Sequence, residues 1–446
     1  MRRFARWIPQ NLRQLDNISC VPLRSTKTSV GAKDVDGASF QQEAVLYVHW
    51  PYCEKRCTYC NFNKYISNAV DHRRMRDSLC TEFRTLHSLS HVTRIQSIFF
   101  GGGTPSLAEP ETIYKVIETV KDTVDLPADV EVTIEVNPSS TEAAKLGAFK
   151  DAGINRVSLG VQALNDMDLT VLGRQHTVEE ALRTLDICKK LFHGRTSVDV
   201  IFGRPGQMLS AWNEELQQIL NLCDDHISLY QLTLERGTSF HKDVMDRKLM
   251  MLPANKMADL YEAAVQVLED AGFSRYEASN FARHGAESSH SQAYWQGMQY
   301  IGIGPGAHGR FVPKAKNKTV REARIQTLEP EPWMYEVEKY GHATRRAVPQ
   351  SQLDVLQEIL MLGLRTKIGV PSERWLKFSH GPTLDEVFNN TYMVKLLQNE
   401  KFLILDDKGL RTTAQGLNVV DSIMPELLNV MDKYFELMQP KALNVS

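Results

Sequence analysis

The 446-residue sequence predicts an α/β fold, in which a partial parallel βα barrel is followed by a small, mainly helical, winged-helix-like C-terminal domain. From about residue 44, short runs rich in Val, Ile and Phe alternate with segments of helical periodicity, as buried parallel strands and their crossover helices do. Glycine and polar residues follow these runs directly, at the ends where such barrels build their functional sites. From about residue 350 the pattern changes to helices around one hairpin.

The barrel contains six predicted strands. In order along the chain they are 44–50, 95–100, 130–136, 155–162, 197–203 and 226–234. Segments with apolar residues at three- and four-residue steps predict helices at about 70–88, 110–124, 177–192 and 255–273. Residues 290–311 are rich in glycine and aromatic residues, and we expect strand and loop packed near the mouth of the barrel.

The C-terminal region is predicted to contain helices at 352–370, 393–400 and 414–428 and a hairpin at 402–413. Helices with a small hairpin suggest a winged-helix-like domain, and such domains often bind nucleic acid. Residues 345–446, however, contain 12 Lys or Arg and 12 Asp or Glu, so this region carries no net charge. We therefore favour a docking or lid domain and predict no nucleic-acid partner.

The overall composition is that of a large globular protein. The chain is 42% hydrophobic and 24% charged, and its formal net charge of −2 gives no global field that favours nucleic acid. It has no run of about 18 apolar residues, so no membrane span is predicted, whereas peripheral contact with a membrane is left open. Seven cysteines, an odd number in a long chain, indicate a reducing compartment rather than a disulfide framework.

The first 30 residues differ from the rest, with six Lys or Arg and one acidic residue, Asp16. This arginine-rich, acid-poor composition is typical of a mitochondrial transit peptide, although a disordered basic tail is the alternative. We therefore predict a mitochondrial protein. The expected divisions are a transit peptide and disordered lead at 1–35, the partial barrel at 40–240, a barrel extension at 241–345 and the C-terminal helical domain at 346–446.

Three cysteines, Cys53, Cys57 and Cys60, lie in one short loop after the first predicted strand. Three closely spaced thiols can hold zinc or an iron–sulfur cluster. A structural zinc site usually has four protein ligands, and His49 is near enough in sequence to supply the fourth. A 4Fe–4S cluster held by three cysteines would instead leave one iron open to an exchangeable small molecule.

The motifs at the strand ends resemble a known family. A Cys-x-x-x-Cys-x-x-Cys loop after the first strand of a βα barrel, followed by a glycine-rich loop after the second, is similar to the radical SAM signature. Several stretches resemble the branch that contains oxygen-independent coproporphyrinogen III dehydrogenase and the HemW-type heme chaperones, which includes mitochondrial members in animals. These stretches are YVHWPYCEKRCTYCNF, FFGGGTPS, IEVNP, VSLGVQ, LGRQHT, IFGRPGQ, YEASNFAR and GIGPGAH, within residues 44–440.

The resemblance implies that Cys53, Cys57 and Cys60 hold a 4Fe–4S cluster and that S-adenosylmethionine (SAM) completes the coordination of the fourth iron. It also implies a SAM pocket formed by Tyr47, Tyr59, Gly102, Gly103, Thr104, Glu135, Gln162, Arg174 and Asp199. In that pocket the glycines would let the backbone approach the methionine part, since glycine has no side chain to block it. Arg174 would suit a carboxylate.

Two further positions bear on the choice within the branch. Phe62 stands where, in the resemblance, the dehydrogenases carry a further Cys and the heme chaperones carry Phe. The stretch from His290 to Trp295 resembles a His-Asn-x-x-Tyr-Trp motif of the chaperones, with Ser291 in place of Asn. The resemblance implies that His290 binds heme, because imidazole is a common axial ligand of heme iron. The alternative is a hydrogen-bonded loop histidine beside two core aromatic residues.

These observations favour a mitochondrial heme chaperone that binds heme, a 4Fe–4S cluster and SAM and transfers heme to an acceptor protein. No catalytic residue is assigned, because coproporphyrinogen oxidation is disfavoured by Phe62. The alternative is an oxygen-independent coproporphyrinogen III oxidase, a radical SAM decarboxylase of porphyrin biosynthesis. A zinc-stabilised binding module is a third reading, and it predicts a protein without iron.

Overall fold

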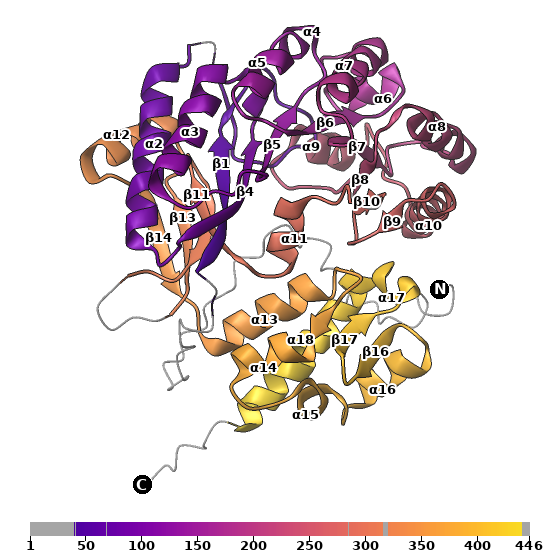
Figure 1. Ribbon diagram of the computed structural model, residues 1–446. Helices are drawn as coiled ribbons and strands as arrows, with labels where there is room; N and C mark the ends of the chain where they lie inside the picture. The colour runs from indigo at the N-terminus through magenta and orange to yellow at the C-terminus, as the bar shows by residue number, and fades with distance from the viewer. Residues whose placement is uncertain (1–39, 41, 68, 284, 315–319, 439–446) are drawn as a thin grey trace.

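A computed structural model describes residues 40, 42–67, 69–283, 285–314 and 320–438 (Figure 1). The predicted transit peptide and lead at 1–35 therefore lie outside the described residues. A twelve-stranded sheet forms the centre of the described chain, in the order β14-β13-β12-β11-β1-β4-β5-β6-β7-β8-β10-β9. The strands from β11 through β1 to β8 in this order run parallel, and antiparallel strands extend the sheet at both edges.

The six predicted barrel strands are confirmed. They are β1 (Glu43–Trp50), β4 (Arg94–Gly102), β5 (Glu131–Val136), β6 (Arg156–Gln162), β7 (Thr196–Phe202) and β8 (His226–Gln231). The other strands of the sheet are β9 (Ser274–Arg275), β10 (Asn280–Ala282), β11 (Gln299–Ile303), β12 (His308–Phe311), β13 (Glu322–Gln326) and β14 (Thr344–Pro349). The described strands do not close on themselves, so the predicted partial barrel, and with it the fold class, is confirmed.

Helices cover the outer face of the sheet (Figure 1). They include α2 (His72–Leu89), α3 (Pro110–Thr123), α4 (Ser140–Ala143), α5 (Leu146–Asp151), α6 (Asp166–Val171), α7 (Val178–Leu191), α8 (Leu209–Leu222), α9 (Ser239–Met245), α10 (Ala254–Asp270) and α12 (Pro330–Tyr340). Their apolar faces pack on outward strand residues such as Val48, Ile98 and Leu159 in one buried cluster. Side-chain caps define the starts of some of them, as where Asp71 accepts from the backbone N–H of Arg74 at the start of α2.

The inner face of the same strands is polar. Because side chains alternate along a strand, the positions between the outward apolar residues point to the opposite face of the sheet. On β5, β6, β7 and β8 these positions include Glu135, Ser158, Asp199 and Ser228, which lie near one another across adjacent strands. The sequence therefore builds an apolar outer layer and a polar interior from one alternating pattern.

The stretch at 290–311 differs from the prediction. Its first part is the helix α11 (Ser289–Trp295), followed by β11 and β12, and α11 lies at the amino ends of the strands rather than near the mouth. The cause is Glu131, the first residue of β5, whose carboxylate accepts from the backbone N–H groups of Ser289 and His290. Figure 1 shows α11 between the sheet and the C-terminal domain.

The C-terminal domain is mainly helical and has its own buried core. It contains α13 (Gln352–Gly363), β15 (Val370–Pro371), α14 (Ser372–Ser379), α15 (Leu384–Phe388), α16 (Tyr392–Asn399), β16 (Leu403–Asp406), β17 (Gly409–Thr412), α17 (Ala414–Leu417) and α18 (Val420–Met438). The predicted hairpin is confirmed as β16 and β17. The helix predicted at 352–370 ends at Gly363, because residue 370 pairs with β17 instead.

The C-terminal domain contacts the amino-end side of the barrel. The backbone N–H of Ala278 donates to Arg365 O at 2.9 Å, and Arg275 Nη2 donates to Ala414 O at 2.9 Å. The mouth lies at the carboxyl ends, which are the opposite ends of the same strands. These contacts therefore do not cover the mouth. Within the described ranges, the chain has no helix with the length and apolar content needed to cross a bilayer.

Candidate functional site

The cysteine loop is fixed to the barrel from several sides. A short parallel pairing of β2 (Tyr52–Cys53) with β3 (Tyr65–Ile66) closes its base. At its tip, the Thr58 backbone N–H donates to Leu172 O at 3.0 Å, the Thr58 hydroxyl donates to Val171 O at 2.8 Å, and Thr58 O accepts from the Phe240 N–H at 2.9 Å. The cysteines of the described chain are all free thiols. The loop therefore presents three unmodified sulfur atoms from a fixed backbone.

Two of the sulfur atoms already accept hydrogen bonds. The Thr104 hydroxyl donates to Cys53 Sγ at 3.3 Å, and Arg174 Nη1 donates to Cys57 Sγ at 3.4 Å. Burial raises the pKa of Cys53 to about 11, and the Thr104 hydroxyl opposes this rise. Donors of this kind stabilise thiolates, which are the ligands of iron–sulfur clusters. In the part of the chain that the structure describes, no group of three His, Cys, Asp or Glu side chains forms a site for a metal ion.

His49 has no free nitrogen for a metal. Its Nε2 lies 2.8 Å from Asn63 O, and its Nδ1 lies 3.0 Å from Tyr47 Oη. Because a carbonyl oxygen can only accept, Nε2 carries the hydrogen and Nδ1 accepts from the Tyr47 hydroxyl. Burial lowers the pKa of His49 to about 4, so the ring is neutral at pH 7. The zinc site that the sequence left open therefore lacks its fourth ligand.

The glycine-rich loop after β4 packs against the cysteine loop. Gly102 has φ +115°, and a Cβ there would lie 2.5 Å from the His49 ring. A Cβ on Gly103 would lie 2.8 Å from Tyr52 O, while the Gly103 N–H donates to Trp50 O at 2.7 Å. These glycines are thus required by the close approach of two loops of this chain, in addition to the backbone approach to SAM that the resemblance implies.

Asn137 joins the two sulfur-binding side chains, and the sequence did not assign it to the site. Asn137 Nδ2 donates to Thr104 Oγ1 at 3.2 Å, and Asn137 Oδ1 accepts from Arg174 Nη2 at 2.6 Å. A continuous path of polar contacts therefore runs from Cys53 through Thr104, Asn137 and Arg174 to Cys57. In the sequence, Asn137 was marked only by its place directly after a predicted strand and before Pro138, in the stretch IEVNP.

Two carboxylates face one another in the interior. Glu135 Oε2 accepts from the Gly102 N–H at 3.1 Å, and Asp199 accepts from the hydroxyls of Ser158 at 2.6 Å and Ser197 at 3.0 Å. Burial and then the charge of Asp199 raise the pKa of Glu135 to about 8. Burial also raises the pKa of Asp199. Because each negative charge disfavours the other, a cationic ligand bound between the two carboxylates would stabilise both.

Gln162 and the two tyrosines complete the set predicted for the SAM pocket. Gln162 has φ +69°, which is unusual for a residue other than glycine, and its buried Oε1 has no partner among the described residues. Tyr47 stacks on Phe99 in the interior with ring centroids 6.3 Å apart. Tyr59 packs on an apolar cluster beside the loop, and burial raises the pKa of both tyrosines. The predicted residues thus surround the interior near the mouth.

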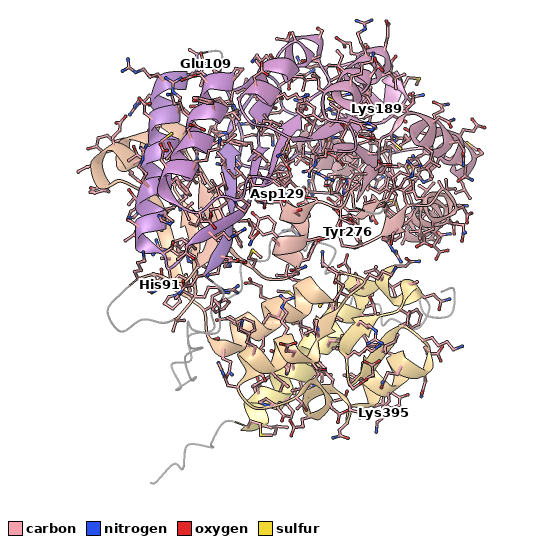
Figure 2. All side chains as sticks on the ribbon, in the orientation of Figure 1. His91, Glu109, Asp129, Lys189, Tyr276 and Lys395 are labelled. Atoms are coloured by element: carbon pink, nitrogen blue, oxygen red, sulfur yellow. The ribbon has the colours of Figure 1, made fainter. Side chains whose placement is uncertain are left out.

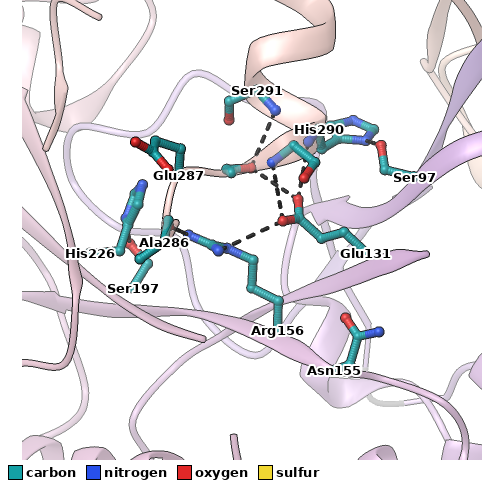
Figure 3. A network of polar contacts seen from close by, with 12 residues as sticks. Ser97, Glu131, Asn155, Arg156, Ser197, His226, Ala286, Glu287, His290 and Ser291 are labelled. Carbon is teal, nitrogen blue, oxygen red and sulfur yellow. Dashed lines mark hydrogen bonds and ion pairs between the residues drawn. The ribbon is translucent and has the colours of Figure 1, made fainter. Parts of the chain in front are cut away.

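His290 lies toward the amino ends of the strands and meets this group at Phe99, on which both His290 and Tyr47 stack. Its side chain is 2% exposed, Nδ1 lies 2.8 Å from Ser97 Oγ, and Nε2 has no hydrogen-bond partner in the described chain (Figure 3). The ring stacks on Phe99 with centroids 5.0 Å apart and meets Tyr294 edge-on at 4.7 Å. Burial lowers the pKa of His290 to about 3. Five residues of β4 separate Ser97 from Gly102, or about 17 Å at about 3.3 Å per residue.

Known proteins match nearly the whole chain. Residues 47–219 match the radical SAM superfamily, and residues 350–419 match the HemN C-terminal domain. Radical S-adenosyl methionine domain-containing protein 1, mitochondrial, of Bos taurus is 49% identical over 90% of this chain and 91% of its own length. The protein of the same name from Mus musculus is 52% identical over 87% and 88%. These relatives confirm the predicted mitochondrial location.

More distant matches extend to bacteria. Heme chaperone HemW of Bacillus subtilis is 30% identical over 83% of this chain and 95% of its own length. A solved structure of coproporphyrinogen III oxidase (HemN) from Escherichia coli aligns with a TM-score of 0.71 at 20% identity, over 89% of this chain and 92% of that one. At that identity the match shows a shared fold.

Proposed function

Because the chain belongs to the radical SAM family, together with its mitochondrial relatives and the HemW heme chaperones, we propose that it is a mitochondrial heme chaperone. It binds a 4Fe–4S cluster and SAM, and it transfers heme to an acceptor protein. The observation that carries the heme assignment is the unpartnered Nε2 of His290, held neutral in a buried aromatic setting. A neutral imidazole nitrogen without a hydrogen-bond partner is the form that ligates iron.

The cluster assignment is supported by the sulfur environment. Cys53, Cys57 and Cys60 would hold the cluster, which together with SAM supplies one-electron chemistry when bound. Thr104 and Arg174 donate to two of the sulfurs and would stabilise them as thiolates. The proposed SAM pocket contains Tyr47, Tyr59, Gly102, Gly103, Thr104, Glu135, Gln162, Arg174 and Asp199.

Ser97 fixes the form of the proposed heme ligand. When its hydroxyl oxygen accepts from His290 Nδ1–H at 2.8 Å, the lone pair lies on Nε2, which then faces no competing donor. Because the ring is buried, heme can reach it only after α11 is uncovered. The contact of Arg374 Nη1 with Trp295 O, at 3.5 Å, is one of the contacts with the C-terminal domain that would have to open.

The test is a heme titration of the anaerobically reconstituted protein, followed by the Soret band. We expect His290→Ala to weaken heme binding by about 10–100-fold, as the loss of metal partners does, and to change the Soret position at normal iron and sulfide content. His193→Ala is the control, since His193 is exposed between α7 and β7, far from the motif in sequence. Unchanged affinity and spectrum in His290→Ala would refute the heme site.

Oxygen-independent coproporphyrinogen III oxidation is the second candidate, and the fold shared with HemN is the observation that favours it. Against it, Phe62 is 61% exposed at the end of the cysteine loop and offers no thiol. We expect no 5′-deoxyadenosine and no protoporphyrinogen when coproporphyrinogen, SAM and a strong reductant are supplied. Stoichiometric conversion would promote this candidate over the chaperone.

A further inference from the structure

A buried chain of hydrogen bonds connects Asp199 to the start of α11. Asp199 Oδ1 lies 3.0 Å from Ser197 Oγ, and Ser197 Oγ lies 2.7 Å from His226 Nδ1. His226 Nε2 lies 2.8 Å from Tyr276 Oη, which accepts from the Ser288 N–H at 3.4 Å. Ser288 is the N-cap of α11. Figure 2 shows Tyr276 where the barrel meets the C-terminal domain, and Figure 3 shows Ser197 and His226 side by side.

The Asp199 end of the chain fixes its direction, because the Ser197 hydroxyl has a single hydrogen and Asp199 takes it. The Ser288 N–H can only donate, and an ionised Asp199 can only accept. The Tyr276 hydroxyl therefore donates to His226 Nε2, His226 Nδ1–H donates to Ser197, and the Ser197 hydroxyl donates to Asp199. His226 is 3% exposed, and burial together with Arg156 lowers its pKa well below the usual value, so it has the single N–H that this direction requires.

Asp199 has only one acceptor site left for a ligand. A carboxylate offers about four acceptor sites, and the hydroxyls of Ser158, Ser197 and Ser228 take three of them. The charged or titratable groups that face it are Glu135 on β5, Arg156 on β6 and Tyr230 on β8. Burial disfavours the charge of Asp199, and the three hydroxyl donors, followed by the charge of Arg156, favour its ionised form.

We propose that His226 and Tyr276 are positioning residues, which direct the Ser197 hydroxyl onto Asp199 and so keep that carboxylate an ionised acceptor for SAM. This inference rests on the SAM pocket of the proposed function but not on its heme site. Neither residue touches the ligand. Each acts through the next hydrogen bond in the chain, because aligned hydrogen bonds strengthen one another.

The chain offers a matched set of variants. The amide of Asn can take the place of His226 Nδ1, whereas the amide of Gln lies nearer the place of Nε2. His226→Asn therefore keeps the donor to Ser197, and His226→Gln loses it. Tyr276→Phe removes one hydroxyl and keeps the ring. The readout is SAM binding to the anaerobically reconstituted full-length protein by equilibrium dialysis between pH 6 and 9.

We expect His226→Gln and Tyr276→Phe to bind SAM on the order of threefold more weakly near pH 6.5, with the loss recovered toward pH 9. A weaker donor raises the pKa of Asp199, so Asp199 is protonated near pH 6.5 and ionises again toward pH 9. Any pH effect of Glu135 is the same in all the variants and cancels when they are compared. His226→Asn should bind as the wild type does. Equal affinity in all the variants, or an equal loss at every pH, would overturn the inference. A wild-type protein that fails to bind SAM would overturn the proposed cofactor instead.

Discussion

The two ends of the barrel use one inner sheet face in opposite ways. At the mouth, the side chains are ionisable and converge on the cysteine loop, where Arg174 and Thr104 donate to sulfur. At the amino ends, α11 covers the interior, and His290 is neutral, with one nitrogen that has no hydrogen-bond partner among the described residues. The inward-pointing side chains of one set of strands can therefore form an ionisable site at one end and a neutral aromatic site toward the other end.

Each end also has its own means of holding position. The mouth depends on glycine at Gly102 and Gly103, where two loops come too close for a Cβ. The amino end depends on the ion pair between Glu131 and Arg156, whose charged atoms are 3.6 Å apart and whose side chains are both 4% exposed. It also depends on the hydrogen bonds that the Glu131 carboxylate accepts from backbone N–H groups at the start of α11 (Figure 3). Variants at one end are therefore expected to spare the other.

The largest effect is expected at the mouth. Replacing Cys53, Cys57 and Cys60 together by Ala should abolish the visible iron–sulfur absorbance and the bound iron, because these are the proposed cluster ligands. The measurement is iron and sulfide content after anaerobic reconstitution. Cys223→Ala, at the C-cap of α8 and outside the cysteine loop, is the control and should keep its cluster. Full cluster content in the triple variant would contradict the assignment.

At the amino end, Glu131→Ala should lower the free energy of unfolding by about 3–5 kcal/mol, because it leaves Arg156 buried without its carboxylate. Denaturant unfolding of the cluster-free protein measures this loss. Glu118→Ala removes an exposed pair with Lys121 and should change stability by less than about 1 kcal/mol. If Glu131→Ala is equally mild, the ion pair does not hold α11.

SAM binding should depend on pH through Glu135. With a pKa of about 8, Glu135 is mostly protonated at pH 7 in the free protein. The cationic sulfonium favours the ionised form, so binding releases a proton, and affinity rises by roughly 25-fold between pH 6.5 and 8.5 before it levels off. Calorimetry in buffers of different ionisation enthalpy detects this proton. Glu135→Gln, or the analogue S-adenosylhomocysteine, whose thioether lacks the sulfonium charge, should remove most of the dependence.

The smallest effect is expected for Ser291→Asn, which restores the residue of the chaperone motif. The Ser291 N–H is bound by the N-cap Ser288 at 3.2 Å, a contact that does not involve the side chain being changed. Heme affinity should therefore stay equal or become slightly tighter in the titration used for His290→Ala. A clear weakening would mean that Ser291 has its own role at this end of the barrel.

The mouth was largely predictable from sequence, and the amino end was not. The cysteine spacing, the glycines after β4 and the acid on β5 are local signals, because each depends on a single strand end. The position of His290 depends instead on Glu131, about 160 residues earlier in the chain, which binds the start of α11. Aromatic and glycine content alone suggested strand and loop near the mouth, since composition carries no information on which end of a sheet a segment covers.

The set of parallel strands and the chemistry of the cysteine loop could be predicted from sequence, since apolar runs and cysteine spacing are patterns of a few residues. Which side chains meet depends instead on how distant parts of the chain pack together. Asn137 joins Thr104 to Arg174, and His226 joins Ser197 to Tyr276. These partners are 29 to 50 residues apart in the sequence, and only the packing of neighbouring strands and their loops brings them within hydrogen-bond distance.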